Sequence, residues 1–304
     1  MHFLADYTQK HYLWLSCNMI NKRMMKKCGT ILLLLTAVLC SCNPKGADNS
    51  KNATPGNDNV TDASGDIAAE TSPAEIIGFC DTIPIDSYAP NSPSMKINVA
   101  LEPLTLDNGT ATARAISSIS YAMSGVESDN LSDAIEIYRN KLVSRYEELR
   151  SDYINIRANN EEPFWLNHHY NVKGVCRKGY RGYNNYILEY DEYEGGAHGY
   201  YYTAVHTFDP TDGHEVTLDE IMKEGYEEEL LDAIAAGLIR YSKANGITEL
   251  DRLQSDTGEL FISKNAVLND SCITFIYNPY EIASYATGRI EVDITYEELK
   301  HILK

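Results

Sequence analysis

Apolar and polar residues alternate along residues 95–101, which is the pattern of a strand with one face in the core. Pro103 follows and ends this strand, because proline cannot take part in a central ladder. Further strands are predicted where the second half of the chain becomes rich in aromatic and β-branched residues. These segments are 170–176, 186–193, 201–208, 273–277 and 289–295.

Four segments have apolar residues three or four positions apart and are predicted to be helices. They are a short helix before Gly125, a clearer one over 131–149, the longest over 226–241, and a short C-terminal helix over 296–303. The segment 217–220 reads Thr-x-x-Glu and adds a helical turn with a capping box. Strands and helices together predict an α+β fold. We expect a mainly antiparallel sheet with helices packed on one face, arranged as a small N-terminal subdomain and a larger C-terminal domain.

The N-terminal region predicts a targeting sequence. From residue 24 a short basic segment leads into an apolar run over 31–38, which is too short to span a bilayer. The run ends in Leu-Cys-Ser-Cys at 39–42, which resembles a bacterial lipobox, so residues 24–41 are predicted to be a lipoprotein signal peptide. In that pattern the lipid is attached to the thiol of Cys42. Residues 1–23 have no recognisable role and are interpreted as upstream translation from a wrongly chosen start codon.

The remaining chain is predicted to be a tether followed by two folded parts. Residues 42–72 are mostly small and polar, so they have almost nothing to bury and are predicted to form a flexible tether. A smaller companion domain is predicted over 73–158, and a C-terminal domain over 159–304. We therefore expect a protein of the bacterial envelope that is held to a membrane by its lipid on the extracytoplasmic side, in the periplasm or at the surface.

Acidic residues outnumber basic ones, with 44 Asp and Glu against 26 Lys and Arg among 304 residues. Five basic residues and one acid precede Cys42, so the mature chain has 21 positive and 43 negative residues, a formal charge of −22. A surface this acidic repels phosphate, which argues against nucleic acid as a partner. Cys80, Cys176 and Cys272 remain after Cys42, enough for one intramolecular disulfide at most.

Three motifs in the second half of the chain occur in an order typical of one family. The first is segment 193–199, the second extends from Phe208-Asp209 to 217–220, and the third covers 275–288 and is followed by Tyr-Glu-Glu-Leu at 296–299. Together they resemble the extracytoplasmic domain of the RsiV type, which is found in the RsiV anti-sigma factor and is appended to PdaC-like peptidoglycan deacetylases. The resemblance covers roughly residues 167–304, and the part before it is similar in layout to the companion domain of that family.

The resemblance implies a binding module, because the RsiV domain is a receptor for lysozyme, a cationic enzyme that cleaves peptidoglycan. This chain departs from RsiV in two respects. No cytoplasmic sigma-binding segment precedes the signal peptide, and a lipid anchor replaces the membrane-spanning helix. Signalling to a sigma factor is therefore not expected. We expect binding of a lysozyme-like or other cationic envelope enzyme, or of a peptidoglycan fragment.

The polar residues around a glycine pair have two interpretations. The acidic segment 191–194 and His198 carry oxygen and nitrogen ligands that suit zinc or calcium. Alternatively, Gly195 and Gly196 form a tight turn, and the flanking polar groups, His198 among them, cap backbone amides. No histidine lies four residues from another, so we expect a structural turn, with no metal and no other cofactor.

The segment after the strand 273–277 is the candidate partner-binding surface. Pro279 fixes a sharp exit from the strand, and Tyr280 with Tyr285 offers rigid aromatic surface that suits recognition. A structural corner with its tyrosines packed inward is the alternative. The predicted partner-binding residues are Asn278, Pro279, Tyr280, Glu281 and Tyr285.

No catalytic residue is predicted. The chain lacks Gly-x-Ser-x-Gly, and Thr-Phe-Asp at 207–209, which resembles the acidic motif of polysaccharide deacetylases, is followed by Pro210 where that motif has a second Asp. The predicted function is that of a non-catalytic envelope receptor or inhibitor-like module, and a hydrolase or metal-dependent enzyme acting on envelope polymers is the alternative. A binder needs a continuous exposed patch, whereas an enzyme needs a cleft where carboxylates with shifted pKa values converge.

Overall fold

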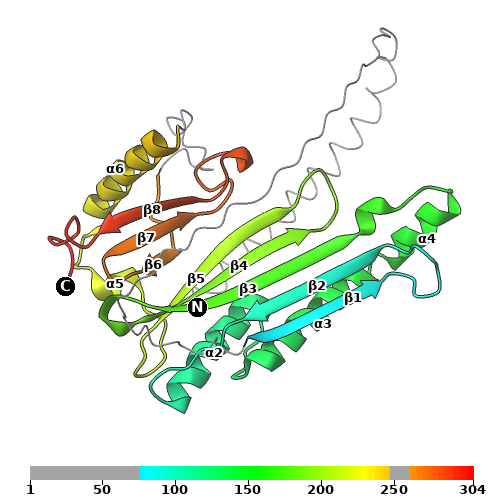
Figure 1. Ribbon diagram of the computed structural model, residues 1–304, viewed down its shortest axis with the longest axis horizontal. Helices are drawn as coiled ribbons and strands as arrows, with labels where there is room; N and C mark the ends of the chain where they lie inside the picture. The colour runs from blue at the N-terminus through cyan, green and yellow to red at the C-terminus, as the bar shows by residue number, and fades with distance from the viewer. Residues whose placement is uncertain (1–75, 247–259) are drawn as a thin grey trace, which may run out of the picture. The chain divides into compact units, whose positions relative to one another are not determined.

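The described residues, 76–246 and 260–304, form two sheets in the computed structural model (Figure 1). The larger sheet has the order β1-β2-β3-β4-β5, and its neighbours are antiparallel except β2 and β3, which are parallel. The smaller sheet has the order β6-β7-β8 and is antiparallel. The strands are β1 (Ile77–Pro84), β2 (Ser94–Leu101), β3 (His168–Lys178), β4 (Asn184–Tyr193), β5 (Tyr200–Phe208), β6 (Ala266–Leu268), β7 (Cys272–Tyr277) and β8 (Ile290–Thr295).

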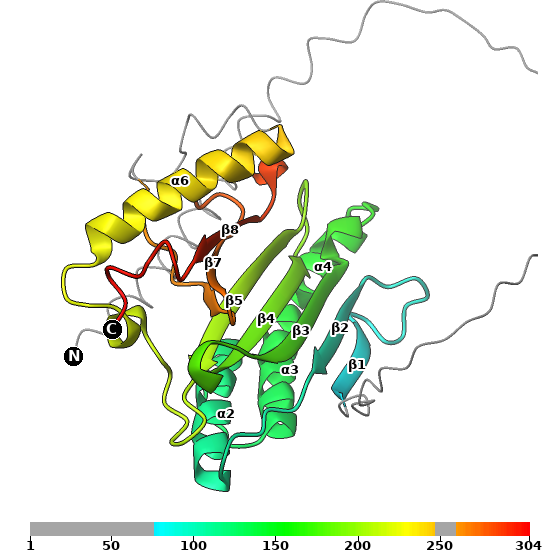
Figure 2. The ribbon, with the colours of Figure 1, turned by 60° about the vertical axis from the view of Figure 1, so that its left-hand side comes forward.

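A helical crossover joins β2 to β3, because a tight turn cannot link parallel neighbours. It contains α2 (Gly109–Ser124), α3 (Leu131–Glu147) and α4 (Arg150–Ala158). The side-chain oxygens of Asn108 and Asn130 accept hydrogen bonds from the first turns of α2 and α3 and so cap these two helices. Both views place α2 and α3 against one face of the larger sheet (Figures 1 and 2).

The core beneath α2 and α3 comes from alternating strand positions. Every second residue of 95–101 is buried, whereas Lys96 and Asn98 are exposed on the opposite face. Tyr186 in β4 is fully buried, and its hydroxyl donates a hydrogen bond to the Glu102 carbonyl at 2.8 Å. The larger sheet therefore has an apolar face toward the helices and a polar face on its other side.

The smaller sheet is covered by α6 (Glu227–Asn245), which follows the single turn of α5 (Leu218–Ile221). α6 packs closely against β8 at Gly237, where a Cβ atom would lie only 2.4 Å from Cγ1 of Val292. The helix ends at Gly246, whose φ of +63° gives the left-handed C-cap that glycine favours.

Asparagine side chains connect the two sheets. The Asn185 amide donates to the Leu268 carbonyl at 3.0 Å and accepts from the Leu268 N–H at 2.9 Å. Asn278 makes the corresponding pair of bonds to the backbone of Thr203 in β5. A small apolar cluster between the sheets contains Val205, Val267 and Ile276.

The predicted α+β fold class is confirmed, with a mainly antiparallel larger sheet and helices on one of its faces. The six predicted strands and the capping box at 217–220 are present. The sequence pattern did not predict β1, β6 or α4. The helix predicted over 296–303 is wrong: these residues form a series of turns. Tyr296 stacks on Tyr180, with ring centroids 4.2 Å apart, and its hydroxyl donates a hydrogen bond to the Asn269 carbonyl. These contacts hold the segment in a non-helical path.

The larger sheet crosses the boundary predicted between 73–158 and 159–304. β2 precedes that boundary and β3 follows it, and their register pairs Met95 with His168 and Leu101 with Gly174. The described residues on both sides of that boundary belong to one compact unit.

The predicted N-terminal segments, 1–23, 24–41 and 42–72, lie outside the described residues, and so does the predicted lipidation residue Cys42. Within the part of the chain that the structure describes, no helix has the length and apolar character needed to cross a membrane.

Candidate functional site

The connection from β7 to β8 begins with a tight turn at 278–283. The Asn278 N–H donates to the Glu281 carboxylate at 2.7 Å, and the Glu281 N–H donates to the Asn278 carbonyl at 3.1 Å. Tyr280 lies in this turn with φ +73°, a left-handed value that is rare for a bulky side chain. Its N–H donates to the Ala283 carbonyl at 3.1 Å. Hydrogen bonds of the turn therefore hold Tyr280 in a strained conformation.

The predicted partner-binding residues include both buried and exposed members. Asn278 and Pro279 are buried, and the Asn278 side chain bonds to β5. Glu281 and Tyr285 are half-buried, whereas the Tyr280 side chain is 53% exposed. The accessible part of this predicted surface is therefore centred on Tyr280, and Asn278 and Pro279 are buried next to it in the chain.

Aromatic contacts join this turn to the glycine-containing turn predicted at 193–199. The rings of His198 and Tyr285 stack with centroids 4.2 Å apart. Tyr280 and Tyr201 each lie 5.6 Å from Tyr285, measured between ring centroids, and the Tyr280 hydroxyl is 3.4 Å from His198 Nε2. We call His198, Tyr201, Tyr280 and Tyr285 the aromatic corner. The sequence predicts the two turns separately, and the structure brings them together.

The two glycines both have positive φ angles, +86° at Gly195 and +108° at Gly196. A Cβ atom at Gly195 would lie 2.5 Å from the carbonyl oxygen of Trp165, whereas Gly196 faces open space. His198 Nδ1 lies 2.8 Å from the Gly199 carbonyl oxygen, which orients the ring that stacks on the aromatic corner. The turn therefore depends on glycine through its backbone angles and, at Gly195, through a close backbone approach.

The acidic residues before the glycines point in different directions. Glu194 forms an ion pair with Arg145 at 2.5 Å and accepts a hydrogen bond from the Tyr170 hydroxyl at 2.6 Å. Burial raises the pKa of Glu192 to about 7, with a further contribution from the neighbouring charge of Glu194. Strand alternation places Asp191 on the opposite face of β4 from Glu192.

The different directions of these carboxylates are relevant to the alternative in which segment 191–194 and His198 bind a metal ion. Within residues 76–246 and 260–304, no three His, Cys, Asp or Glu side chains gather in an arrangement that could hold a metal ion. The described cysteines are unpaired, and they are Cys80, Cys176 and Cys272.

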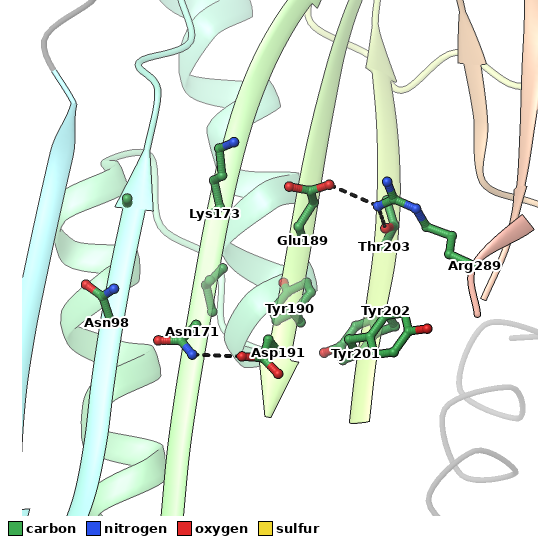
Figure 3. A pocket seen from close by; sticks show the side chains of 12 residues that line it. Asn98, Asn171, Lys173, Glu189, Tyr190, Asp191, Tyr201, Tyr202, Thr203 and Arg289 are labelled. Carbon is green, nitrogen blue, oxygen red and sulfur yellow. Dashed lines mark hydrogen bonds and ion pairs between the residues drawn. The ribbon is translucent and has the colours of Figure 1, made fainter. Parts of the chain in front are cut away.

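An open cleft of about 420 Å³ lies on the face of the larger sheet opposite α2 and α3 (Figure 3). Most of its exposed lining is apolar, and we call it the polar cleft after the amide, hydroxyl and charged side chains that line it. The strand register aligns its side chains in two rows that cross β2, β3, β4 and β5. The first row is Asn98, Asn171, Asp191 and Tyr201, and the second row is Ala100, Lys173, Glu189 and Thr203.

Arg289, immediately before β8, forms one wall of the polar cleft. One guanidinium nitrogen donates to Glu189 at 2.9 Å and to the Thr203 hydroxyl at 2.8 Å, and another pairs with Glu291 at 2.7 Å. Partial burial acts to lower the pKa of Arg289, but the hydrogen bonds and charges of the two carboxylates raise it above its ordinary value. Arg289 is therefore a fixed, charged wall that connects the two sheets.

The sequence alone assigns no role to the residues of the polar cleft. A signal was present in the outward-facing polar residues Asn98, Asn171 and Asp191, each in a separate predicted strand. These residues converge through the pairing of the strands, including the parallel pair β2 and β3. A strand pattern gives the face of a residue but not its cross-strand neighbour, so the row could not be derived from it.

Comparison with known proteins identifies a DUF3298 domain in the C-terminal part of the chain. Residues 219–297 match the family described as "Protein of unknown function (DUF3298)". This stretch contains α6, the smaller sheet and the turn at Tyr280, but only Arg289 among the residues that line the polar cleft.

Two solved structures of DUF3298 family proteins have a similar fold. A DUF3298 family member from Bacteroides fragilis NCTC 9343 is 25% identical to this chain, with a TM-score of 0.65, and the match covers 76% of this chain and 92% of the other. A DUF3298 family protein from Pseudomonas aeruginosa PAO1 is 16% identical with a TM-score of 0.50, covering 76% and 95%, and shows similarity of fold alone. None of the curated proteins matches this chain significantly.

Proposed function

We propose that this chain is a lipid-anchored binding protein of the bacterial envelope, an RsiV-like receptor or inhibitor-like module without catalytic activity. Its partner in this proposal is a lysozyme-like or other cationic enzyme of the envelope. Cys42 carries the lipid, and residues 42–72 separate the folded part from the membrane. The aromatic corner is the partner-binding surface.

The observation that carries this proposal is the conformation of Tyr280. A tyrosine at φ +73° is strained by an amount on the order of 1–3 kcal/mol, and glycine at this position would remove that strain. More than half of the side chain is exposed, so packing in the core does not account for the tyrosine. A rigid and exposed aromatic side chain loses little conformational freedom on binding, which is the property of an interface anchor.

The charge of the chain supports a cationic partner. A net charge of −22 on the mature chain attracts a basic enzyme over long distances and accelerates encounter. At physiological salt this attraction is screened over ~8 Å, so it adds little to specificity. Specificity then depends on the aromatic corner.

The position of Glu192 supports a non-catalytic role. Burial raises the pKa of its carboxyl group, which lies among tyrosines on the helix-facing side of β4. The polar cleft lies on the other side of the sheet. The acid with the perturbed pKa is thus separated from the surface where a polymer substrate would lie.

The test is the affinity of the purified full-length protein for a c-type lysozyme, measured at low and at physiological salt. Tyr280→Ala should weaken binding by ~2 kcal/mol, about thirtyfold, and leave the melting temperature nearly unchanged. Tyr121→Ala is the matched control, because Tyr121 is similarly exposed, at 50%, but lies in α2. It should leave affinity unchanged.

Two outcomes count against this proposal. Absence of lysozyme binding by the wild-type protein at low salt rejects lysozyme as the partner. Equal effects of Tyr280→Ala and Tyr121→Ala on affinity reject the aromatic corner as the binding surface.

A further inference from the structure

The polar cleft presents side chains at a regular spacing across four strands. Neighbouring strands in a sheet are ~4.8 Å apart, and residues on the same face of one strand are separated by ~6.6 Å. The first row therefore offers two amides, a carboxylate and a tyrosine ring at successive strand positions, from Asn98 to Tyr201. Figure 3 shows this row in front of the sheet, with the helices behind it. A linear ligand lying across the strands meets one of these groups at every strand.

Two groups of the first row, Asn171 and Asp191, are oriented before any ligand arrives. Asn171 donates a hydrogen bond from Nδ2 to the Asp191 carboxylate at 2.9 Å, which fixes both side chains. Asn98 is exposed, and its side-chain amide has no hydrogen-bond partner among residues 76–246 and 260–304. Its amide can therefore both donate to and accept from a ligand.

The charges that line the polar cleft balance. Lys173 and Arg289 are positive, and Glu189 and Asp191 are negative. This balance contrasts with the charge of −22 on the mature chain. The cleft therefore favours an uncharged ligand that has both hydrogen-bonding groups and apolar surface, whereas a cationic protein is attracted by the acidic surface as a whole.

Tyr201 provides the apolar part of the site. It ends the first row and touches Tyr285 edge-on, so the cleft continues into the aromatic corner. A sugar ring has an apolar face of C–H groups that packs on an aromatic ring, while its hydroxyl groups at the edge donate and accept hydrogen bonds. Planar amides and carboxylates beside an aromatic ring match both features. The volume of the cleft also lies within the ~300–1,000 Å³ of ordinary ligand sites.

From these observations we propose that the polar cleft binds an uncharged glycan chain, which lies along the first row with a sugar ring on Tyr201. Asn98 and Asn171 bond to its hydroxyl or acetamido groups, and Asp191 accepts from its hydroxyl groups. In the bacterial envelope, a chain of β-1,4-linked N-acetylated amino sugars is a glycan of this class that the protein would meet. That identification rests on the envelope location in the proposed function, whereas the binding of a glycan does not.

The test is calorimetric titration of the purified full-length protein with a β-1,4-linked tetramer of N-acetylglucosamine. The wild-type protein should bind it, and Asn98→Ala and Asn171→Ala should each weaken binding about fivefold or more, consistent with the loss of one hydrogen bond. Asn155→Ala is the matched control, because Asn155 is an exposed asparagine in α4, and it should leave affinity unchanged. Melting curves of all three variants should match the wild type.

A second titration uses tetraglycine, because an extended peptide is the main competing occupant of an open sheet face. Binding of tetraglycine that Asn98→Ala weakens equally overturns the glycan assignment. Absence of tetramer binding at millimolar concentration, or unchanged affinity in both cleft variants, also overturns it. Because the lysozyme test uses Tyr280 and a different ligand, a protein that binds the tetramer but not lysozyme supports the glycan site and rejects only the proposed protein partner.

Discussion

The side-chain amide of Asn278 bonds to both backbone groups of Thr203, as a neighbouring strand would. The Thr203 N–H donates to Oδ1 of Asn278 at 2.7 Å, and Nδ2 donates to the Thr203 carbonyl at 3.0 Å. Thr203 belongs to β5, the last strand of the larger sheet, so the amide satisfies part of an edge that would otherwise be buried without partners. This pair also fixes the start of the turn that presents Tyr280.

The first prediction concerns this pair. Asn278→Ala should lower the free energy of unfolding by about 2–4 kcal/mol, because it leaves the N–H and the carbonyl of Thr203 unpaired in a position that is only 2% exposed. Chemical denaturation provides the measurement. Asn98→Ala is the control, and it should change stability by less than ~0.5 kcal/mol because Asn98 is exposed. Equal stability of the two variants would show that the amide pair contributes little.

A second prediction separates the two glycines of segment 193–199. Gly196→Val should cost ~1–3 kcal/mol, because valine disfavours the φ of +108° although the space around it is open. Gly195→Ala should cost more than Gly196→Ala, because its Cβ atom would also clash with the Trp165 carbonyl at 2.5 Å. Melting temperatures of the two alanine variants give the comparison. The reverse order would mean that the Trp165 segment moves away at little cost.

Local patterns were sufficient to predict most elements of the fold. The strand at 95–101 and the helix at 131–149 both follow from the spacing of apolar residues, which depends only on neighbours in the chain. β1 was not predicted because Gly78, Asp81 and Pro84 are poor strand formers, and as an edge strand it has no fully buried residue.

The features that could not be predicted from the sequence depend on contacts between residues that lie far apart in the chain. The row from Asn98 to Tyr201 exists through strand register, and the aromatic corner exists because Tyr285 lies against His198. The wrongly predicted helix at 296–303 has the same cause, since its path is set by bonds such as that from the Lys304 N–H to the Ile221 carbonyl. The sequence therefore shows which kinds of residue a site contains, whereas the fold shows which of them lie together.

The third prediction uses the pKa of Glu192, which burial raises from its ordinary value of 4.5 to about 7. Between these two values the folded protein binds the proton more tightly than the unfolded chain, so stability should fall as the pH rises from 4.5 to 7. Glu192→Gln should remove this loss and be more stable than the wild type at pH 8 by up to ~3 kcal/mol, since one pKa unit corresponds to ~1.36 kcal/mol. At pH 4.5 the two proteins should be similar.

The control for this prediction is Glu147→Gln, which changes an exposed glutamate in α3. It should leave the pH dependence of stability as it is in the wild type. Urea denaturation of the wild type and both variants at pH 4.5 and pH 8 gives the six free energies required. A Glu192→Gln variant that is no more stable at pH 8 would contradict the burial of the ionised carboxylate.

The fourth prediction concerns Cys42, which lies outside the described residues. The mature protein should begin at Cys42 and carry a diacylglyceryl group, so Cys42→Ala should release the protein from membranes or leave an uncleaved precursor. Cys80→Ala, which removes an exposed thiol of the folded part, should remain anchored. Intact mass and detergent partitioning test both variants. A wild-type N-terminus upstream of Cys42 would rule out the lipoprotein prediction.

The last prediction separates the backbone of Tyr280 from its ring. Tyr280→Gly and Tyr280→Ala both remove the exposed aromatic group, so they should weaken lysozyme binding equally. They should differ in stability, because alanine keeps the cost of the left-handed conformation at φ +73°, roughly 1–2 kcal/mol, and glycine does not. Glycine also gains freedom in the unfolded chain, which offsets part of this difference, so Tyr280→Gly should be more stable than Tyr280→Ala by about 1 kcal/mol or less.

The matched control is Tyr88, a 96% exposed tyrosine that does not have a positive φ. At Tyr88 the order should reverse, and Tyr88→Gly should be less stable than Tyr88→Ala by about 0.5–1 kcal/mol. No left-handed conformation is relieved there, so only the greater freedom of glycine in the unfolded chain affects stability. Urea denaturation gives the difference in free energy of unfolding between the glycine and alanine variants at each position. Opposite signs of this difference at Tyr280 and Tyr88 would show that the turn keeps its strained conformation when the ring is absent. The same sign at both positions would show that the turn relaxes, and that Tyr280 itself, rather than its supporting hydrogen bonds, maintains the conformation proposed for binding.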